Sequence, residues 1–211
     1  MIKFATDSDR ERIIELWVGA FGDKRESVEC FLKYFPCNNA LGRYVNNELV
    51  SFMFLPELWL DYKGEKYRTN YIYALCTAPE YRSNGYASEL IDYSKNYSAK
   101  NNIPYTLIRP GTERLFSYYS HRGFEREYCR IKKNLTIDSN LLYNNMNSDL
   151  PDVAFAQWGD DGLGYSLKCG IEVGCYAPCF DKDKGERYIM LRRNLEGVLL
   201  FENVFMELTF E

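Results

Sequence analysis

The residues best suited to chemistry lie between Arg82 and Ala87, directly after an apolar and aromatic run that ends at Thr77. A strand that enters a loop and then a helix directs unpaired main-chain N–H groups and the positive end of the helix dipole toward one point. Arg82 adds a full positive charge, and Gly85 lets an anion approach the backbone without a Cβ in the way. This segment therefore predicts a binding site for a diphosphate.

Regular elements must hold this loop in place. Apolar residues recur at helical spacing in some segments and alternate or form short runs in others. In the run that ends at Thr77, Tyr71 and Tyr73 share one face and Ile72 and Cys76 the other, so both faces are apolar, which is typical of a central strand. The pattern predicts helices at 8–21, 28–35, 87–100 and 112–122. It predicts a first strand that ends at residue 45 and further strands at 49–60, 67–77, 105–109 and 124–133.

The hexapeptide at 82–87 (Arg-Ser-Asn-Gly-Tyr-Ala) resembles the Q/R-x-x-G-x-G/A acetyl-CoA signature of the GNAT superfamily of N-acetyltransferases. The predicted order of elements resembles the GNAT fold over roughly residues 1–135. The resemblance implies an α/β acyl-CoA N-acyltransferase fold, with a mixed, largely antiparallel sheet flanked by helices. Residues 136–211 are then a small, β-rich C-terminal extension of unknown role.

Within the superfamily, the segment at 71–82 looks most like the branch named for enhanced intracellular survival. Members of that branch add a second GNAT-like region and a sterol-carrier-like domain. Only 76 residues (211 − 135) follow residue 135, which is too few for both. The polyamine or aminoglycoside substrates of the branch therefore do not transfer with the resemblance.

The resemblance also implies an activity and the residues that perform it. Acetyl would pass from acetyl-CoA to a primary amine by direct transfer, with Tyr119, four residues before a Gly-Phe pair, as the acid for the departing thiolate. Main-chain N–H groups near Leu75 would polarise the thioester carbonyl, where the central strand parts from 105–109. Tyr118, about 100° round the helix, is expected to face solvent or the tail. The residues implied to bind the cofactor are Leu75, Cys76, Thr77, Arg82, Ser83, Asn84, Gly85, Tyr86 and Ala87.

Two departures from the superfamily leave alternatives open. No carboxylate lies between Asn70 and Thr77, where several relatives keep a general base, so a water relay or a carboxylate elsewhere must serve. One candidate is the carboxyl terminus at Glu211, because the related branch uses its own. Arg109-Pro110-Gly111-Thr112 replaces the Asn that often follows the preceding strand. The alternative function is a non-catalytic acyl-CoA-binding or sensing module.

Composition excludes several other classes of protein. The 211 residues are 46% hydrophobic, as in a packed globular protein, and carry a net charge of −4, so no basic field favours nucleic acid or an anionic membrane. The start of the chain lacks a signal-peptide pattern, and we expect a cytoplasmic protein. Its expected partner is a small-molecule or peptide amine, with a homo-oligomer possible through the extension.

The cysteines and the single histidine indicate no metal chemistry. Seven cysteines are scattered without a C-x-x-C pair, so we expect reduced, mostly buried thiols. The spacing of Cys169, Cys175 and Cys179 fits no common zinc pattern. His121 is expected to be exposed near a helix end, without a catalytic role. Gly162-Leu163-Gly164 lacks the rest of a dinucleotide fingerprint.

Overall fold

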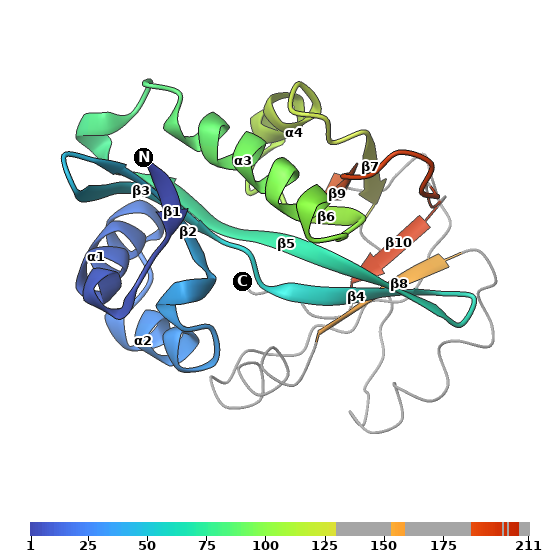
Figure 1. Ribbon diagram of the computed structural model, residues 1–211, viewed down its shortest axis with the longest axis horizontal. Coiled ribbons are helices and arrows are strands. Elements are labelled where there is room, and N and C mark those ends of the chain that lie inside the picture. The colour runs from blue at the N-terminus through green and yellow to red at the C-terminus, as the bar shows by residue number, and fades with distance from the viewer. Residues whose placement is uncertain (130–152, 159–186, 200, 202, 207–211) are drawn as a thin grey trace.

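The computed structural model of this chain describes residues 1–129, 153–158, 187–199, 201 and 203–206 (Figure 1). The helices are α1 (Arg10–Phe21), α2 (Arg25–Tyr34), α3 (Tyr86–Lys100) and α4 (Glu113–Ser120). The strands are β1 (Ile2–Phe4), β2 (Ala40–Val45), β3 (Glu48–Phe54), β4 (Glu57–Tyr62), β5 (Glu65–Thr77), β6 (Tyr105–Ile108), β7 (Arg126–Cys129), β8 (Val153–Trp158), β9 (Arg187–Arg193) and β10 (Asn203–Met206).

The sheet is mixed and is built around the long strand β5. One edge of β5 pairs antiparallel with β3 and then β4, while the other edge pairs with β6 in the parallel direction. β2 and β1 continue the sheet beyond β3, and β8 and β10 continue it beyond β4. This arrangement is the predicted GNAT fold, a mixed and largely antiparallel sheet with strands from the C-terminal region.

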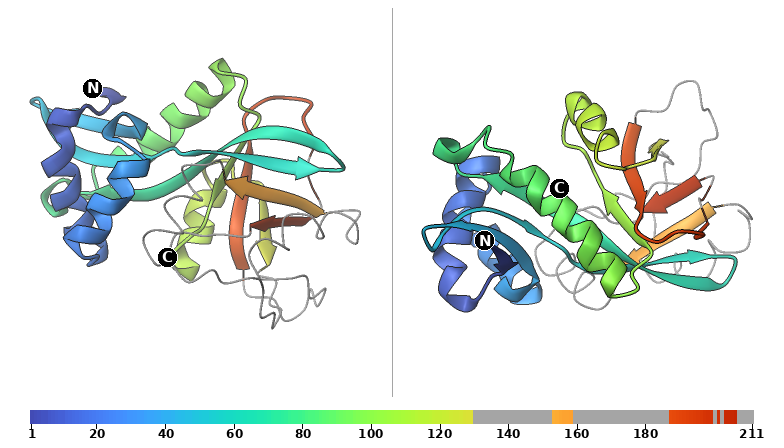
Figure 2. Two further views of the ribbon diagram at one scale, coloured as in Figure 1. Left: turned by 90° about the horizontal axis from the view of Figure 1, so that it is seen from below. Right: turned by 45° about the horizontal axis from the view of Figure 1, so that its top comes forward.

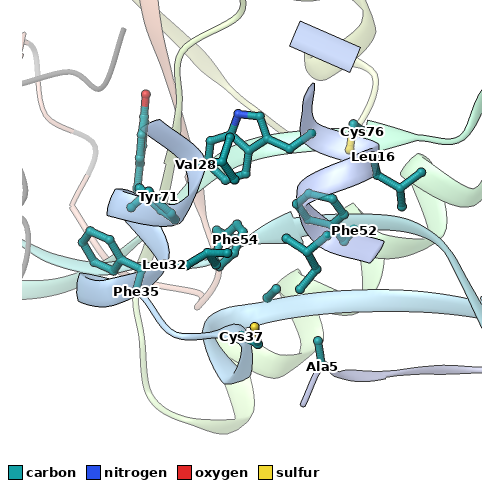
Figure 3. Close-up of a cluster of buried hydrophobic side chains, with 14 of the residues drawn as sticks. Ala5, Leu16, Val28, Leu32, Phe35, Cys37, Phe52, Phe54, Tyr71 and Cys76 are labelled. Atoms are coloured by element: carbon teal, nitrogen blue, oxygen red, sulfur yellow. The ribbon is translucent and has the colours of Figure 1, made fainter. Parts of the chain in front are cut away.

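Helices cover both faces of the sheet and create two cores (Figures 1 and 2). α1 and α2 lie on one face, where Trp17 packs against the rings of Phe31 and Phe54 at centroid distances of 5.0 and 5.6 Å. Figure 3 shows Phe54 in this core together with Val28 and Leu32 of α2. α3 and α4 lie on the other face, where Ile91 and Phe116 are buried. Burial of apolar area on both faces of β5 makes it the rigid element on which a site can be built.

The predicted meander is confirmed in its order but not in every boundary. The strand predicted at 49–60 is two strands, because Pro56 has no N–H to donate to a ladder and interrupts the run. The carbonyl of Pro56 instead accepts a hydrogen bond from Tyr71 N at 2.9 Å. The short strand β1 was not predicted, since three residues carry too little pattern to be recognised.

The predicted alternation of side chains along β5 is wrong after Tyr73. Ala74 has a positive φ of 51°, and the pairing with β3 shifts register between Phe52 and Phe54. This β-bulge adds one residue and exchanges the faces of the residues that follow. Cys76 consequently shares the α1 and α2 core with Tyr71, although alternation placed the two on opposite faces.

The sheet includes a strand from beyond residue 135 between two of its earlier strands. β9 pairs antiparallel with both β6 and β7 and so lies between them, although more than 50 residues separate it from β7 in sequence. Its Arg192 is fully buried and donates hydrogen bonds to Ile91 O at 3.2 Å and Ser94 Oγ at 3.0 Å, both on α3. Burial lowers the pKa of Arg192 to about 10. Strands close in space need not be close in sequence, and local pattern cannot reveal such an insertion.

The cysteines differ in part from expectation. Cys37 and Cys76 are buried free thiols, as predicted. Cys30, by contrast, is disulfide-bonded, so the prediction of reduced thiols is wrong at this residue. Sequence spacing does not show which thiols folding brings within bonding distance. Cys169, Cys175 and Cys179 lie outside the described residues.

Candidate active site

A cavity of about 770 Å³ lies between the end of β5, the loop before α3, α4 and the C-terminal end of α1. It brings together every predicted site residue except Asn84. The predicted residues that line it are Leu75, Cys76, Thr77, Arg82, Ser83, Gly85, Tyr86, Ala87 and Tyr119. Asn84 lies beside them and braces the loop through hydrogen bonds from its Nδ2 to Tyr81 O at 3.0 Å and Arg82 O at 3.3 Å.

One wall of the cavity is the end of β5, beyond the ladder that the structure describes between β5 and β6. The parallel pairing of β5 with β6 ends at Ile72 and Ile108, so the predicted parting of these two strands is confirmed. We call residues 73–77 the strand gap. The bulge at Ala74 bends β5 here, and residues 73–75 are partly exposed although they lie in the middle of the molecule. Residues 75–77, which line the cavity, lie beyond the end of the ladder with β6.

Another part of the cavity is formed by residues 82–88, which we call the anion cradle. Gly85 adopts the left-handed conformation (φ 79°) as the N-cap of α3, and no side chain caps the helix there. The first-turn N–H groups consequently remain available to a ligand. Arg82 is held beside them by a hydrogen bond from its Nε to Thr77 O at 3.2 Å.

The charges around the cavity are of one sign. Arg82 and Arg114 both line it, and no lining residue in the described part of the chain is a carboxylate. An anionic ligand is therefore favoured at the cradle by two full charges and by the positive end of the α3 dipole. Arg114 was not predicted, because nothing local distinguishes it from other arginines at helix starts.

Tyr119 lies near the strand gap and is almost completely buried, with 6% of its surface exposed. Its ring packs edge-on against Phe124 at 5.6 Å, and its hydroxyl has no hydrogen-bond partner among the residues that the structure describes. Burial raises its pKa above the usual range. A buried phenol that lines a cavity and lacks an internal partner is suited to donate its proton to a ligand.

Tyr118 is placed differently from the prediction. It was expected to face solvent or the tail, yet it is half-buried and lines the cavity beside Tyr119. Its hydroxyl lies 3.2 Å from Ser88 Oγ on α3, and the guanidinium of Arg122 lies 3.5 Å from its ring centroid. The prediction failed because α3 packs against α4 on this side, so the direction that helical geometry assigned to solvent points at another helix.

Two further contributions to the site had no local signal in the sequence. Ala20 and Phe21, at the end of α1, line the cavity although more than 50 residues separate them from the strand gap. Ser51 on β3 is fully buried, donates to Cys76 O at 2.7 Å and lies 2.8 Å from Thr77 Oγ1. Both contributions depend on tertiary contacts. Ser51 holds the main chain of the strand gap from the neighbouring strand β3.

Cys76 lines the cavity but is not a suitable nucleophile. Burial raises the pKa of its thiol to about 12, so almost none of it is thiolate at neutral pH. Its part in the site is therefore structural, with its carbonyl bound by Ser51.

The remaining predicted features lie outside the cavity. His121 is exposed, and its Nδ1 lies 2.6 Å from Ser117 O. Among the described residues, no cluster of His, Cys, Asp and Glu has a metal-binding arrangement, and none of the helices has the length and apolar character needed to span a bilayer. Glu211, a candidate base, is outside the described part of the chain.

Comparison with known families assigns the class of this chain. Residues 1–126 match the family model described as an acetyltransferase (GNAT) domain, which covers more than half of the sequence. The chain therefore belongs to the GNAT family, and this membership supports acyl transfer. A search of curated proteins found no match.

Solved structures with the same fold are distant in sequence. A GCN5-related N-acetyltransferase from Kribbella flavida has a TM-score of 0.55 at 12% identity, covering 92% of this chain and 72% of that one. One from Anabaena variabilis ATCC 29413 has a TM-score of 0.54 at 20% identity, covering 62% and 32%. Eis1 from Mycobacterium abscessus has a TM-score of 0.50 at 15% identity, covering 65% and 37%. This chain spans about a third of the latter two, and such identities show the fold alone.

Proposed function

We propose that this protein is an N-acetyltransferase that transfers acetyl from acetyl-CoA to a primary amine in a ternary complex. The observation that carries the proposal is the single cavity that joins the anion cradle to the strand gap and to Tyr119. The cradle supplies charge and main-chain donors, while the strand gap supplies the main chain of β5 beyond its ladder with β6. A CoA thioester needs both, because its diphosphate and its reactive carbon lie at opposite ends of a long arm.

The cradle residues suit the diphosphate of the co-substrate. Arg82, the first-turn N–H groups of α3 and the left-handed Gly85 present donors and leave the backbone open to an approaching oxygen. The arm would then extend along residues 75–77, whose main chain borders the same cavity. N–H groups of the strand gap would stabilise the oxyanion that develops on the thioester carbonyl.

The transfer requires an exchange of bonds at the thioester carbon and the movement of protons. The amine nitrogen attacks the thioester carbon, the C–S bond breaks, and the products are an amide and a thiol. The leaving thiolate takes the phenolic proton of Tyr119, which burial keeps protonated at neutral pH. An ammonium has no lone pair, so the acceptor must lose one proton before it attacks, and a water relay is the proposed route. After the attack the nitrogen loses a second proton, which restores the phenol of Tyr119.

The acceptor is proposed to be a small-molecule or peptide amine. Phe21 and Leu115 give the cavity apolar surface for the carbon skeleton of such an acceptor. Placement in the branch named for enhanced intracellular survival, a cytoplasmic location and a homo-oligomer formed through residues 136–211 stay predictions.

A second function, an acyl-CoA-binding or sensing module, is favoured by one observation. No carboxylate among the described residues lines the cavity, so none is in place to take the ammonium proton. A sensor would need the anion cradle without a base. The two functions therefore differ in turnover and share cofactor binding.

The test is release of free thiol from acetyl-CoA by the full chain against a panel of primary amines, together with calorimetric titration of CoA. An acetyltransferase should bind CoA and release thiol only when a suitable amine is present. Tight CoA binding without amine-dependent release across the panel would favour the sensor. Absence of CoA binding would refute both functions.

A further inference from the structure

Tyr118 stands where α4 faces the first turn of α3. Its hydroxyl is 3.2 Å from the Oγ of Ser88, the third residue of α3, and Ser88 belongs to the anion cradle. Tyr118 and Ser88 line the same cavity as Arg82. The superfamily resemblance assigned a role to Tyr119 and none to Tyr118, so the position of this second hydroxyl needs its own explanation.

Arg122 determines the direction of the hydrogen bond between Ser88 and Tyr118. It donates to Ser88 Oγ twice, from Nε at 3.1 Å and from Nη2 at 2.6 Å. A serine oxygen has two lone pairs, so both are engaged. Ser88 must then be the donor toward Tyr118, and the Tyr118 oxygen is the acceptor.

The proton of Tyr118 therefore remains free to donate elsewhere. The described residues offer its hydroxyl no second partner, and the ring is fixed by Arg122 on its face and by Tyr119 at 5.1 Å. Arg122 is itself held by a hydrogen bond from Nη1 to Tyr118 O at 2.8 Å. A fixed O–H beside the first turn of α3 adds one donor to the N–H groups and the charge of Arg82.

We propose that Tyr118 is a phosphate-binding residue, whose hydroxyl donates a hydrogen bond to a phosphate oxygen of the bound acyl-CoA. The inference rests on the proposed function, because it requires a phosphorylated acyl donor in the cradle. Phosphate oxygens accept several hydrogen bonds at once, and the hydroxyl proton of Tyr118 has no acceptor among the described residues. Tyr118 thus serves affinity while Tyr119 serves the chemical step.

CoA carries phosphate at two places, the diphosphate and the 3′-phosphate, and the experiment separates them. The full chain is titrated with CoA and with dephospho-CoA, which lacks the 3′-phosphate, and pantetheine, which has no phosphate, is measured by competition. The variants are Tyr118→Phe, which removes one oxygen and keeps the ring, and Tyr93→Phe as a matched control. Tyr93 is exposed on α3 and does not line the cavity.

Tyr118→Phe should weaken CoA binding by about tenfold, as expected for loss of one hydrogen bond to a charged oxygen, and leave pantetheine unchanged. An equal loss for dephospho-CoA places the bond on the diphosphate, and no loss places it on the 3′-phosphate. Both results support the proposal, and Tyr93→Phe should match the wild type.

The inference is overturned if Tyr118→Phe binds CoA as tightly as the wild type, or if pantetheine binding falls by the same factor as CoA binding. Neither result touches the proposed function, which requires only that the wild type bind CoA and turn it over. Wild-type protein that bound no CoA would remove both. Thermal unfolding of each variant confirms that the titrated protein is folded.

Discussion

The anion cradle and the strand gap present different chemical groups to the cavity. The anion cradle consists of main-chain N–H groups and exposed polar side chains, including Arg82, and Arg114 lines the same cavity. The strand gap holds a thiol and lies near a phenol, both so deeply buried that their pKa values rise. Binding an anion needs donors that water can also reach, whereas proton transfer to a thiolate benefits from a desolvated acid. The same cavity is lined by both environments.

This difference separates the expected effects of substitution. Changes at the cradle should alter affinity and its dependence on salt, because exposed charges are screened. Changes near the strand gap should alter the rate of transfer and leave affinity almost unchanged. Three sets of variants test the separation.

The largest effect is expected for Tyr119→Phe. Loss of the acid should lower kcat by about a hundredfold, within the range for general acid catalysis, while the dissociation constant of CoA stays within about twofold. Steady-state thiol release and calorimetry measure the two quantities. A matched control is Tyr105→Phe. Tyr105 does not line the cavity, and its hydroxyl donates a hydrogen bond to Leu199 O at 2.8 Å.

The raised pKa of Tyr119 predicts how the stability of the protein changes with pH. The folded protein holds the phenol neutral more strongly than the unfolded chain, whose tyrosines titrate near pH 10. The resulting stabilisation is complete below about pH 10 and is lost as the pH rises above it. The unfolding free energy of the wild type should therefore fall more steeply above that pH than that of Tyr119→Phe. Parallel curves would show that Tyr119 is not buried in solution.

Arg82→Ala should change the affinity of the anion cradle. Loss of a charged hydrogen bond to phosphate should weaken CoA binding by about 1.5–3 kcal/mol at low salt, with a smaller difference at high salt. The control is Arg68→Ala, which removes an exposed arginine of β5 that pairs with Glu57 and does not line the cavity. An unchanged dissociation constant for Arg82→Ala would show that the cradle does not bind the diphosphate.

The smallest effects are expected at two left-handed residues, one in the strand gap and one in the anion cradle. Ala74 has a φ of 51° and Gly85 a φ of 79°. Ala74→Gly should relieve backbone strain and raise stability by up to about 1 kcal/mol, whereas Gly85→Ala should lower it by about 1 kcal/mol. A Cβ at Gly85 would meet no atom within 4 Å, so its cost is conformational. Chemical denaturation measures both, and shifts of the same sign would contradict the assigned conformations.

The sequence by itself determined the parts of the site that lie on one stretch of chain. The run from Leu75 to Ala87 predicted a strand, an anion-binding loop and a helix, and the superfamily resemblance implied Tyr119. Such signals are readable because the strand, the turn and the first helical turn are fixed by neighbours a few residues away. Hydrogen bonds and dipoles of a single helix start need no distant partner.

Only the tertiary structure decided how these parts meet. The bulge at Ala74 exchanged the faces of Leu75 and Cys76, and packing of α3 against α4 turned Tyr118 into the cavity. β9 came from far along the chain to complete the sheet between β6 and β7. The physical reason is common to all three. Each depends on contacts between segments that are remote in sequence, and side-chain periodicity records only which face is apolar, without recording what covers it.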